Sequence, residues 1–198
     1  MGHLFQCRCG ALRGEVDEPH RAMRAVCYCR DCRTYAHWLG RQQQVLDAAG
    51  GTDVVATHSR YVRLTAGAPQ LACMSLSPKG LLRWYARCCD TPVANTPRDW
   101  KLPYVGLVHT CLERLQPLEA SFPPVQMDIN TRSALGPTPN RGGPGVMAKF
   151  GAMVLRLSAA RLTGSYRRTV FFDAKGEPVA AVHVPPKAEV DAARSAAA

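Results

Sequence analysis

The segment Cys27-Tyr-Cys29-Arg-Asp-Cys32 decides the fold of this chain, because it places three thiols within six residues. Each Cys–Zn bond is only ~2.3 Å long, so cysteines this close in sequence converge on one soft metal ion. The side chains between them are aromatic or charged, which disfavours the role of small buried hydrophobes for all three cysteines. Three thiolates leave one position of a tetrahedral ion open. We interpret this cysteine triplet as a zinc site with a vacant fourth position.

A second pair of cysteines, in Cys7-Arg-Cys9-Gly10, precedes the triplet. Two ligands do not hold a structural zinc ion, so this pair needs partners from elsewhere. Cys88 and Cys89 follow a predicted strand and are the natural suppliers. A closed site of four cysteines would tie the N-terminal segment to this later turn and contribute to folding. Neighbouring side chains of a strand point to opposite faces, so adjacent cysteines reach one ion only where the backbone turns.

The composition is that of an ordinary globular protein, with 46% hydrophobic and 20% charged residues among 198. We predict a single domain over residues 1–198. The N-terminus lacks the apolar core of a signal peptide, and no run of about eighteen apolar residues occurs. We therefore expect a cytoplasmic protein with no membrane partner. In a reducing compartment the nine cysteines are metal ligands or catalytic thiols rather than disulfides.

The formal net charge of +10 is compatible with a nucleic-acid partner, an anionic membrane face or an acidic substrate. The basic residues are scattered, however, and the pair Arg167-Arg168 is their longest run. We favour a solvated basic surface over a nucleic-acid site.

The pattern of short apolar runs between Gly and Pro residues predicts a mainly β fold. Cys29 opens a single helical turn over residues 29–36, and residues 104–115 fit either a helix or a strand. The predicted strands are residues 3–7, 11–16, 23–27, 53–57, 61–65, 71–76 and 81–86.

The second half of the chain is predicted to form an extension, residues 98–186, to a core over residues 3–97. An amphipathic helix is expected over residues 146–161, with Val146, Phe150, Met153, Val154 and Leu157 as its apolar stripe. A β-hairpin is expected over residues 169–184, with Gly176 in its turn. The alanine-rich residues 187–198 are predicted to be a disordered tail.

The cysteine motifs resemble those of the glutathione-dependent formaldehyde-activating enzymes, a family grouped with centromere protein V. Members have a Cys-x-Cys-Gly start, a central Cys-x-Cys-x-x-Cys followed by a basic residue, and a later Phe-Cys-x-x-Cys-Gly-Thr-Pro. The resemblance covers residues 3–97, about half of the chain. The matching segments are Cys7-Arg-Cys9-Gly10, Cys27-Tyr-Cys29-Arg-Asp-Cys32-Arg33 and Tyr85-Ala86-Arg87-Cys88-Cys89-Asp90-Thr91-Pro92.

This resemblance implies two zinc sites in a fold of coiled antiparallel sheets. One site would be structural, formed by the first and last cysteine pairs. The other would be catalytic, formed by the triplet. The implied activity joins the thiol of glutathione to formaldehyde, or performs a related carbon–sulfur bond reaction on a small-molecule thiol.

The third motif departs from the family pattern. Ala86 stands where the family has its first cysteine, and Asp90 replaces the glycine. The structural site would then use the adjacent cysteines 88 and 89 together. Alternatively Cys89 binds alone, and Cys73 or Cys111 completes the set.

At the triplet, zinc would offer its fourth position to a substrate thiolate or a carbonyl oxygen. Arg30 and Arg33 flank the ligands and could bind the carboxylates of glutathione, or could act only as solvated charges that offset the thiolates. His37 is the nearest candidate in sequence for proton transfer or for a fourth ligand, although a lone histidine is more often simply packed or exposed.

Three functions remain open from the sequence. The leading one is a zinc-dependent carbon–sulfur lyase-like enzyme that acts on an adduct of glutathione, or another thiol, with an aldehyde. The second is a non-catalytic zinc-binding module that binds nucleic acid or a protein partner. In the third, both zinc ions are structural and residues 98–198 carry the function.

Overall fold

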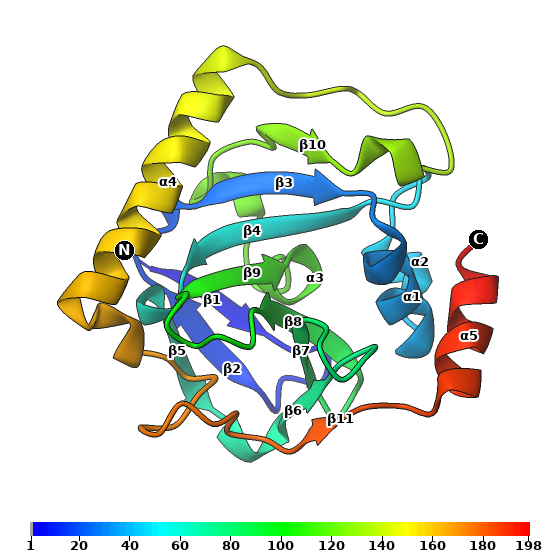
Figure 1. Ribbon diagram of the computed structural model, residues 1–198, viewed down its shortest axis with the longest axis horizontal. Helices are drawn as coiled ribbons and strands as arrows, with labels where there is room; N and C mark the ends of the chain where they lie inside the picture. Colours follow the sequence, from blue (N-terminus) through cyan, green and yellow to red (C-terminus); the bar gives the residue numbers. More distant parts are fainter. Residues whose placement is uncertain (1) are drawn as a thin grey trace.

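Two β-sheets form the body of the molecule, and helices flank them, so the predicted mainly β class is confirmed (Figure 1). The computed structural model describes residues 2–198. The smaller sheet is antiparallel, with the strand order β1-β2-β5. Its strands are β1 (His3–Gln6), β2 (Arg13–Val16) and β5 (Val62–Ala66).

The larger sheet has eight strands in the order β10-β3-β4-β9-β8-β7-β6-β11. They are β3 (Met23–Cys27), β4 (Thr52–His58), β6 (Leu71–Met74), β7 (Leu82–Ala86), β8 (Thr91–Thr96), β9 (Tyr104–Val108), β10 (Met127–Ile129) and β11 (Val182–His183). The six inner strands pair antiparallel, whereas the edge strands β10 and β11 pair parallel to β3 and β6. The sheet is therefore mixed at its edges rather than antiparallel throughout.

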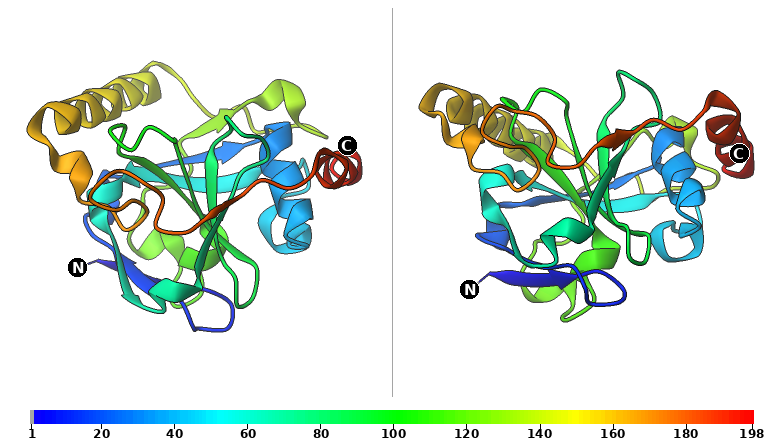
Figure 2. Two further views of the ribbon diagram at one scale, coloured as in Figure 1. Left: turned by 60° about the horizontal axis from the view of Figure 1, so that its bottom comes forward. Right: turned by 90° about the horizontal axis from the view of Figure 1, so that it is seen from below.

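The helix α4 lies beside one end of β3 and β4, whereas α1, α2 and α5 lie beyond the other end, and α3 lies between them next to β9 (Figures 1 and 2). The helices are α1 (Arg30–Trp38), α2 (Gln42–Val45), α3 (His109–Leu112), α4 (Pro144–Thr163) and α5 (Lys187–Ala196). Short 3-10 turns occupy Pro19–Arg21, Ser59–Tyr61, Ala68–Gln70, Leu118–Ala120, Thr131–Ser133 and Ser165–Arg167. Along residues 2–198, none of the helices combines the length and the apolar character that a membrane span requires.

The alternation of side chains along β7 separates the main core from the face that carries α1. Trp84 is fully buried in the core, where its ring lies 5.1 Å from that of Phe171. Tyr85 faces the other way, and its ring lies 5.8 Å from that of Trp38 at the end of α1. Arg83 lies on the same face as Tyr85, so its buried guanidinium is on the side of the sheet where α1 packs.

The ambiguous residues 104–115 form the strand β9 followed by the short helix α3. Thr91 and Pro92 begin the strand β8. Pro92 pairs with Tyr85 of β7, and the register of the two strands shifts between Trp84 and Tyr85. A proline, which has no N–H to donate, is tolerated beside such an irregularity.

The C-terminal half departs from prediction in three places. Residues 187–196 form α5 rather than a disordered tail, because Val190 is buried and α5 packs along α1. The hairpin over residues 169–184 is reduced to one bridge between Phe172 and Pro178, since β11 turns away to pair with β6. The predicted helix is present as α4, but Phe150 and Val154 of its expected apolar stripe are exposed.

Candidate metal centre

Four cysteines from two distant hairpins meet at one end of the molecule, as the sequence predicts. The sulfurs of Cys7, Cys9, Cys88 and Cys89 all lie within 4.8 Å of one another. The Sγ–Sγ distances are 3.6 Å for Cys7–Cys9, 3.7 Å for Cys7–Cys88 and 3.3 Å for Cys9–Cys88. Tetrahedral zinc with ~2.3 Å bonds separates its sulfurs by roughly 3.8 Å. A disulfide requires ~2.05 Å. This four-cysteine cluster therefore fits a metal ion.

The two adjacent cysteines of this cluster reach one point because the chain reverses after β7. The backbone N–H of Cys89 donates to the carbonyl of Ala86 at 3.2 Å, which closes a turn. Asp90 then adopts a left-handed backbone conformation with φ of 52°. Aspartate enters this region more readily than most residues. Asp90 thus takes a conformation that favours glycine, the residue that the resembled motif has at this position.

Cys73 and Cys111 lie outside both cysteine clusters, so the alternative in which either completes the four-cysteine set is wrong. Cys111 is fully buried, and its thiol donates to the carbonyl of Val108 at 3.2 Å. Burial raises the pKa of the Cys73 thiol to about 12. Burial also opposes ionisation of Cys89, but hydrogen bonds from Thr91 and from the backbone near Cys9 lower its pKa to about 6.

The triplet is assembled where β3 ends and α1 begins. Cys27 is the last residue of β3, Cys29 caps the N-terminus of α1, and Cys32 lies in its first turn. The sulfur of Cys29 accepts the backbone N–H of Cys32 at 3.4 Å. The sulfurs of Cys27 and Cys32 are 3.9 Å apart, close to the separation that tetrahedral zinc imposes. The partial positive charge at the N-terminus of a helix also favours thiolates there.

In the part of the chain that the structure describes, no fourth metal-ligating side chain joins the triplet. Its three sulfurs lie within 4.8 Å of one another, and no further Cys, His, Asp or Glu of residues 2–198 joins them. His37, the nearest candidate for a fourth ligand, lies further along α1 and outside this group. The donor set is therefore three thiols, which suits zinc with one open coordination position.

A buried arginine lies against this triplet. Arg83 is only 3% exposed, and its Nη1 is 3.9 Å from the sulfur of Cys32 and 3.1 Å from the Oδ1 of Asn95. Its guanidinium also lies over the ring of Tyr35, 5.1 Å from the centroid. Among residues 2–198 no carboxylate lies within ion-pair distance of it. A buried cation without a counter-charge is costly. Within residues 2–198, the thiols of the triplet are the groups beside Arg83 that can become negative, and they do so when they lose their protons.

The thiols of the triplet resist ionisation when no metal is bound. The hydrogen bond of Cys32 with Cys27, and then burial, raise the pKa of Cys32, while Arg83 acts in the opposite direction. The pKa of Cys27 is raised in the same way, first by its hydrogen bond with Cys29. A metal cation displaces these protons, so binding at the triplet releases protons and supplies the negative charge that Arg83 needs.

Two further polar groups, from distant parts of the sequence, lie in contact with the triplet or close enough to feel its charge. The side-chain amide of Asn130 donates to the sulfur of Cys27 at 3.4 Å. Burial, and then the nearby Cys32 and Cys27, raise the pKa of Tyr104 to about 12, so its phenol keeps its proton at neutral pH. Gly106 makes room for this phenol, because a Cβ there would lie 2.8 Å from the Tyr104 hydroxyl.

The two arginines that flank the triplet in sequence have different surroundings. Arg30 is exposed at the start of α1 and is available to a ligand. Arg33 is buried and donates to the backbone carbonyls of Tyr28, at 2.9 Å, Ala197, at 2.9 Å, and Ser133. Its predicted role in binding the carboxylates of glutathione is therefore replaced by a structural one, because its Nε and Nη1 donors bind backbone carbonyls of the chain.

The sequence pattern of DUF6151, described as a family of unknown function, matches residues 3–183. No curated protein matches the chain. The crystal structure of a Rhodobacter sphaeroides protein, a structural genomics target, is similar over 62% of this chain and 96% of that one. The two sequences are 21% identical and the TM-score is 0.41, a similarity too low to carry an inference about function.

Proposed function

The chain belongs to the DUF6151 family, whose function is unknown, and from its metal centre we propose that it is a zinc-dependent carbon–sulfur lyase-like enzyme. Its substrate would be an adduct of a thiol with an aldehyde, and the cysteine motifs make glutathione and formaldehyde the first pair to test. The observation that carries the proposal is the incomplete set of three thiols held against the buried Arg83.

The charges support a functional site at the triplet. Zinc with three thiolates carries a formal charge of −1, which the guanidinium of Arg83 offsets within hydrogen-bonding distance of Cys32. The four-cysteine cluster has its full ligand set, and two of its members, Cys9 and Cys88, are exposed. We therefore assign a structural role to the four-cysteine cluster and the chemistry to the triplet.

The reaction adds a thiol to an aldehyde and needs no oxidant. A carbon–sulfur bond forms, the carbonyl π bond breaks, and the proton of the thiol is replaced by one on the carbonyl oxygen, which gives a hemithioacetal. When bound at the triplet, zinc would lower the pKa of the substrate thiol and hold it as a thiolate. The protonated phenol of Tyr104 would donate to the carbonyl oxygen, and Arg83 would stabilise the negative charge that develops there.

Arg30 is the group that remains free to bind a carboxylate of glutathione, because it is exposed beside the first turn of α1. We also propose that the protein works in a reducing compartment such as the cytoplasm, since all nine cysteines are free thiols.

The zinc content of purified protein tests the metal sites. We expect two ions per chain in the wild type, one in Cys29→Ser, and two in Cys73→Ala, because Cys73 belongs to neither cluster. X-ray absorption at the zinc edge of Cys9→Ser, which keeps only the triplet intact, should show three sulfurs and one lighter atom. Four sulfurs around this ion, or an unchanged zinc content in Cys29→Ser, would contradict the proposal.

The activity is tested by following labelled formaldehyde and glutathione by NMR exchange spectroscopy. Zinc-loaded wild type and Cys73→Ala should accelerate interconversion of the free aldehyde and its hemithioacetal, and Cys29→Ser should not. If the fully zinc-loaded protein gives no acceleration with glutathione or with other small thiols, the enzymatic proposal is wrong.

A non-catalytic zinc module that binds nucleic acid is the second candidate, and the net charge of +10 is compatible with it. Binding to random-sequence DNA with a steep dependence on salt, together with the absence of thiol chemistry, would support this alternative.

A further inference from the structure

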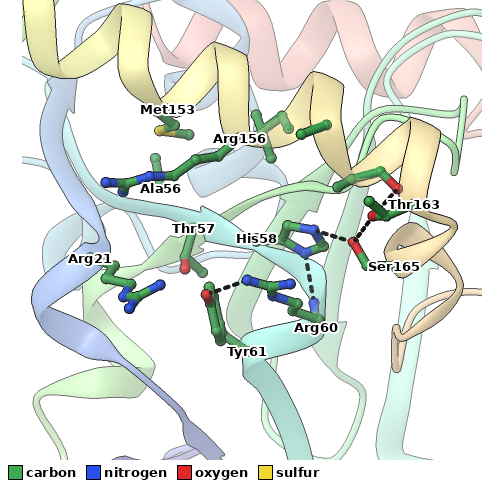
Figure 3. Close-up of a pocket in the computed structure, with 13 residues that line it drawn as sticks. Arg21, Ala56, Thr57, His58, Arg60, Tyr61, Met153, Arg156, Thr163 and Ser165 are labelled. Carbon is green, nitrogen blue, oxygen red and sulfur yellow. Dashed lines mark hydrogen bonds between the residues drawn. The ribbon is translucent and has the colours of Figure 1, made fainter.

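A cavity of about 240 Å³ lies between α4 and the end of β4 (Figure 3). Ala56 and His58 of β4 line one side, and Met153, Leu157 and Ala160 of α4 line the other. A water molecule occupies about 30 Å³ of liquid, so the cavity has room for a small organic molecule and not only for an inorganic ion.

This cavity is separate from the triplet. In the pairing of β3 with β4, Cys27 lies opposite Thr52, whereas Met23 lies opposite Ala56 at the other end. Four residues of strand correspond to about 13 Å, so a small molecule in the cavity does not touch the metal ligands. Figure 1 likewise shows α4 and α1 at opposite ends of β3 and β4. The site therefore does not depend on the function proposed for the triplet.

The cavity is cationic. Arg21, Arg60 and Arg156 contribute guanidinium groups to its lining, which contains no Asp or Glu (Figure 3). Arg21 is paired with Glu18 at 2.8 Å, and Arg60 donates to the hydroxyl of Tyr61 at 2.6 Å. Arg156, within the described residues 2–198, has neither a hydrogen-bond partner nor an ion-pair partner. A guanidinium presents several donors in a fixed fork that matches a carboxylate or a phosphate.

The histidine and serine in the cavity are not arranged as a catalytic pair. Nδ1 of His58 accepts the backbone N–H of Arg60 at 3.0 Å, so the neutral ring carries its proton on Nε2. That nitrogen faces the hydroxyl of Ser165 at 3.5 Å as a donor. It cannot also remove the serine proton, which excludes a Ser–His nucleophile in this tautomer. The hydroxyl of Ser165 is left with its own proton to donate to a ligand.

We propose that the cavity beneath α4 is a second ligand site, which binds a small organic anion through the guanidinium groups and holds its apolar part against α4. The ligand is a carboxylate or a phosphate ester with a short hydrocarbon or aromatic group. Met153 and Leu157 form the apolar wall, and Arg156 is the principal anion contact because no side chain of the described protein competes for it.

Calorimetric titration with phenyl phosphate, benzoate and phenol tests this site. Both anions should bind, and phenol, which has the ring without the charge, should bind at least about tenfold more weakly. The stronger of the two anions identifies the phosphate or the carboxylate class. Inorganic phosphate should bind more weakly than phenyl phosphate, because it leaves the apolar wall without a partner.

Three variants locate the binding. Arg156→Gln should weaken binding of the preferred anion about tenfold, the loss expected for one charge-assisted hydrogen bond. Arg161→Gln is the matched control on the same helix, since Arg161 pairs with Asp99 outside the cavity, and it should change the Kd less than twofold. Ala159→Trp should abolish binding, because it fills the cavity without altering its charge.

Binding should persist in Cys29→Ser, which disables the triplet but leaves the cavity intact. The proposal is overturned if neither anion binds to folded wild type, or if Arg161→Gln weakens binding as much as Arg156→Gln. It is also overturned if binding disappears in Cys29→Ser, since the anion would then belong to the metal site. Circular dichroism of each variant shows whether the helix content, to which α4 contributes most, is unchanged.

Discussion

Replacing Arg83 with methionine should weaken zinc binding at the triplet while leaving the metal-free protein as stable as before, or more stable. The metal-free triplet holds neutral thiols, so Arg83 is then a buried cation without a counter-charge, and methionine removes that cost. In the zinc-bound form the same substitution leaves the −1 charge of the site without its partner. The two forms should therefore respond in opposite directions.

The magnitude follows from the distance of 3.9 Å between Nη1 of Arg83 and the sulfur of Cys32. Two unit charges at this distance attract each other by about 4 kcal/mol at an effective dielectric constant of 20. The negative charge is spread over three sulfurs, so we expect about half of this energy, roughly 2 kcal/mol, or about a 30-fold loss of affinity. Changes to groups that surround metal ligands cost about 10- to 100-fold in affinity, which brackets this value.

Competition with a chromogenic chelator measures the affinity of each of the two zinc ions. In Arg83→Met, only the zinc ion at the triplet should be bound more weakly. Unfolding with and without zinc should show a stabilisation by metal that is smaller by about 2 kcal/mol at saturation. Arg63→Met is the control, because Arg63 is a strand arginine that pairs with the carboxylates of Glu15 and Asp17 and should leave zinc affinity unchanged. Equal destabilisation of both forms of Arg83→Met, with unchanged zinc affinity, would refute the reasoning.

Three other predictions concern the supporting structure. Asp90→Gly should keep both zinc ions, whereas Asp90→Val should lower the free energy of unfolding by about 1–2 kcal/mol in chemical denaturation, since a β-branched residue resists the left-handed conformation. Burial, and then Arg60, lower the pKa of His58 to about 4, so the unfolded state binds more protons below pH 6.5. The free energy of unfolding of the wild type should therefore fall as the pH is lowered from 6.5 to 4. Urea unfolding at the two pH values should show a smaller fall for His58→Gln. Arg33→Met removes hydrogen bonds to three carbonyls and should cost about 2–4 kcal/mol, with faster proteolysis of residues 187–196 as the readout.

The metal centre was the most predictable part of the molecule, because its ligands lie in short segments. Cys27, Cys29 and Cys32 need only one strand end and one helical turn to converge. The four-cysteine cluster required a distant pairing, and the sequence still limited it to a few candidates. What the sequence left open was whether Cys88 and Cys89 act together, since this depends on the turn that Asp90 completes.

Arg83 could not be assigned from the sequence, because its role depends on the register of β7 with β8 and on the packing of α1 against this sheet. It lies 51 residues after Cys32, and its partner Asn95 is positioned by the pairing of β7 with β8. An arginine between the apolar Leu82 and Trp84 is the only local signal, and such a residue more often faces solvent. Likewise α5 was missed because a ten-residue helix is marginal alone and forms here through its contacts with α1.

The position of Arg83 is also the strongest reason to separate the two cysteine clusters by role. If the triplet only held the fold together, an apolar residue of similar size in place of Arg83 would be neutral or stabilising. A buried cation beside a ligand set of three is instead suited to a site whose charge changes, because it offsets the thiolates when metal is bound and is available to further negative charge on a substrate. The four-cysteine cluster reaches solvent at Cys9 and Cys88 and needs no such partner. Within the described residues, a buried cation beside one cluster and none beside the other is the difference expected between a metal site with an open coordination position and one whose four positions are filled by the protein.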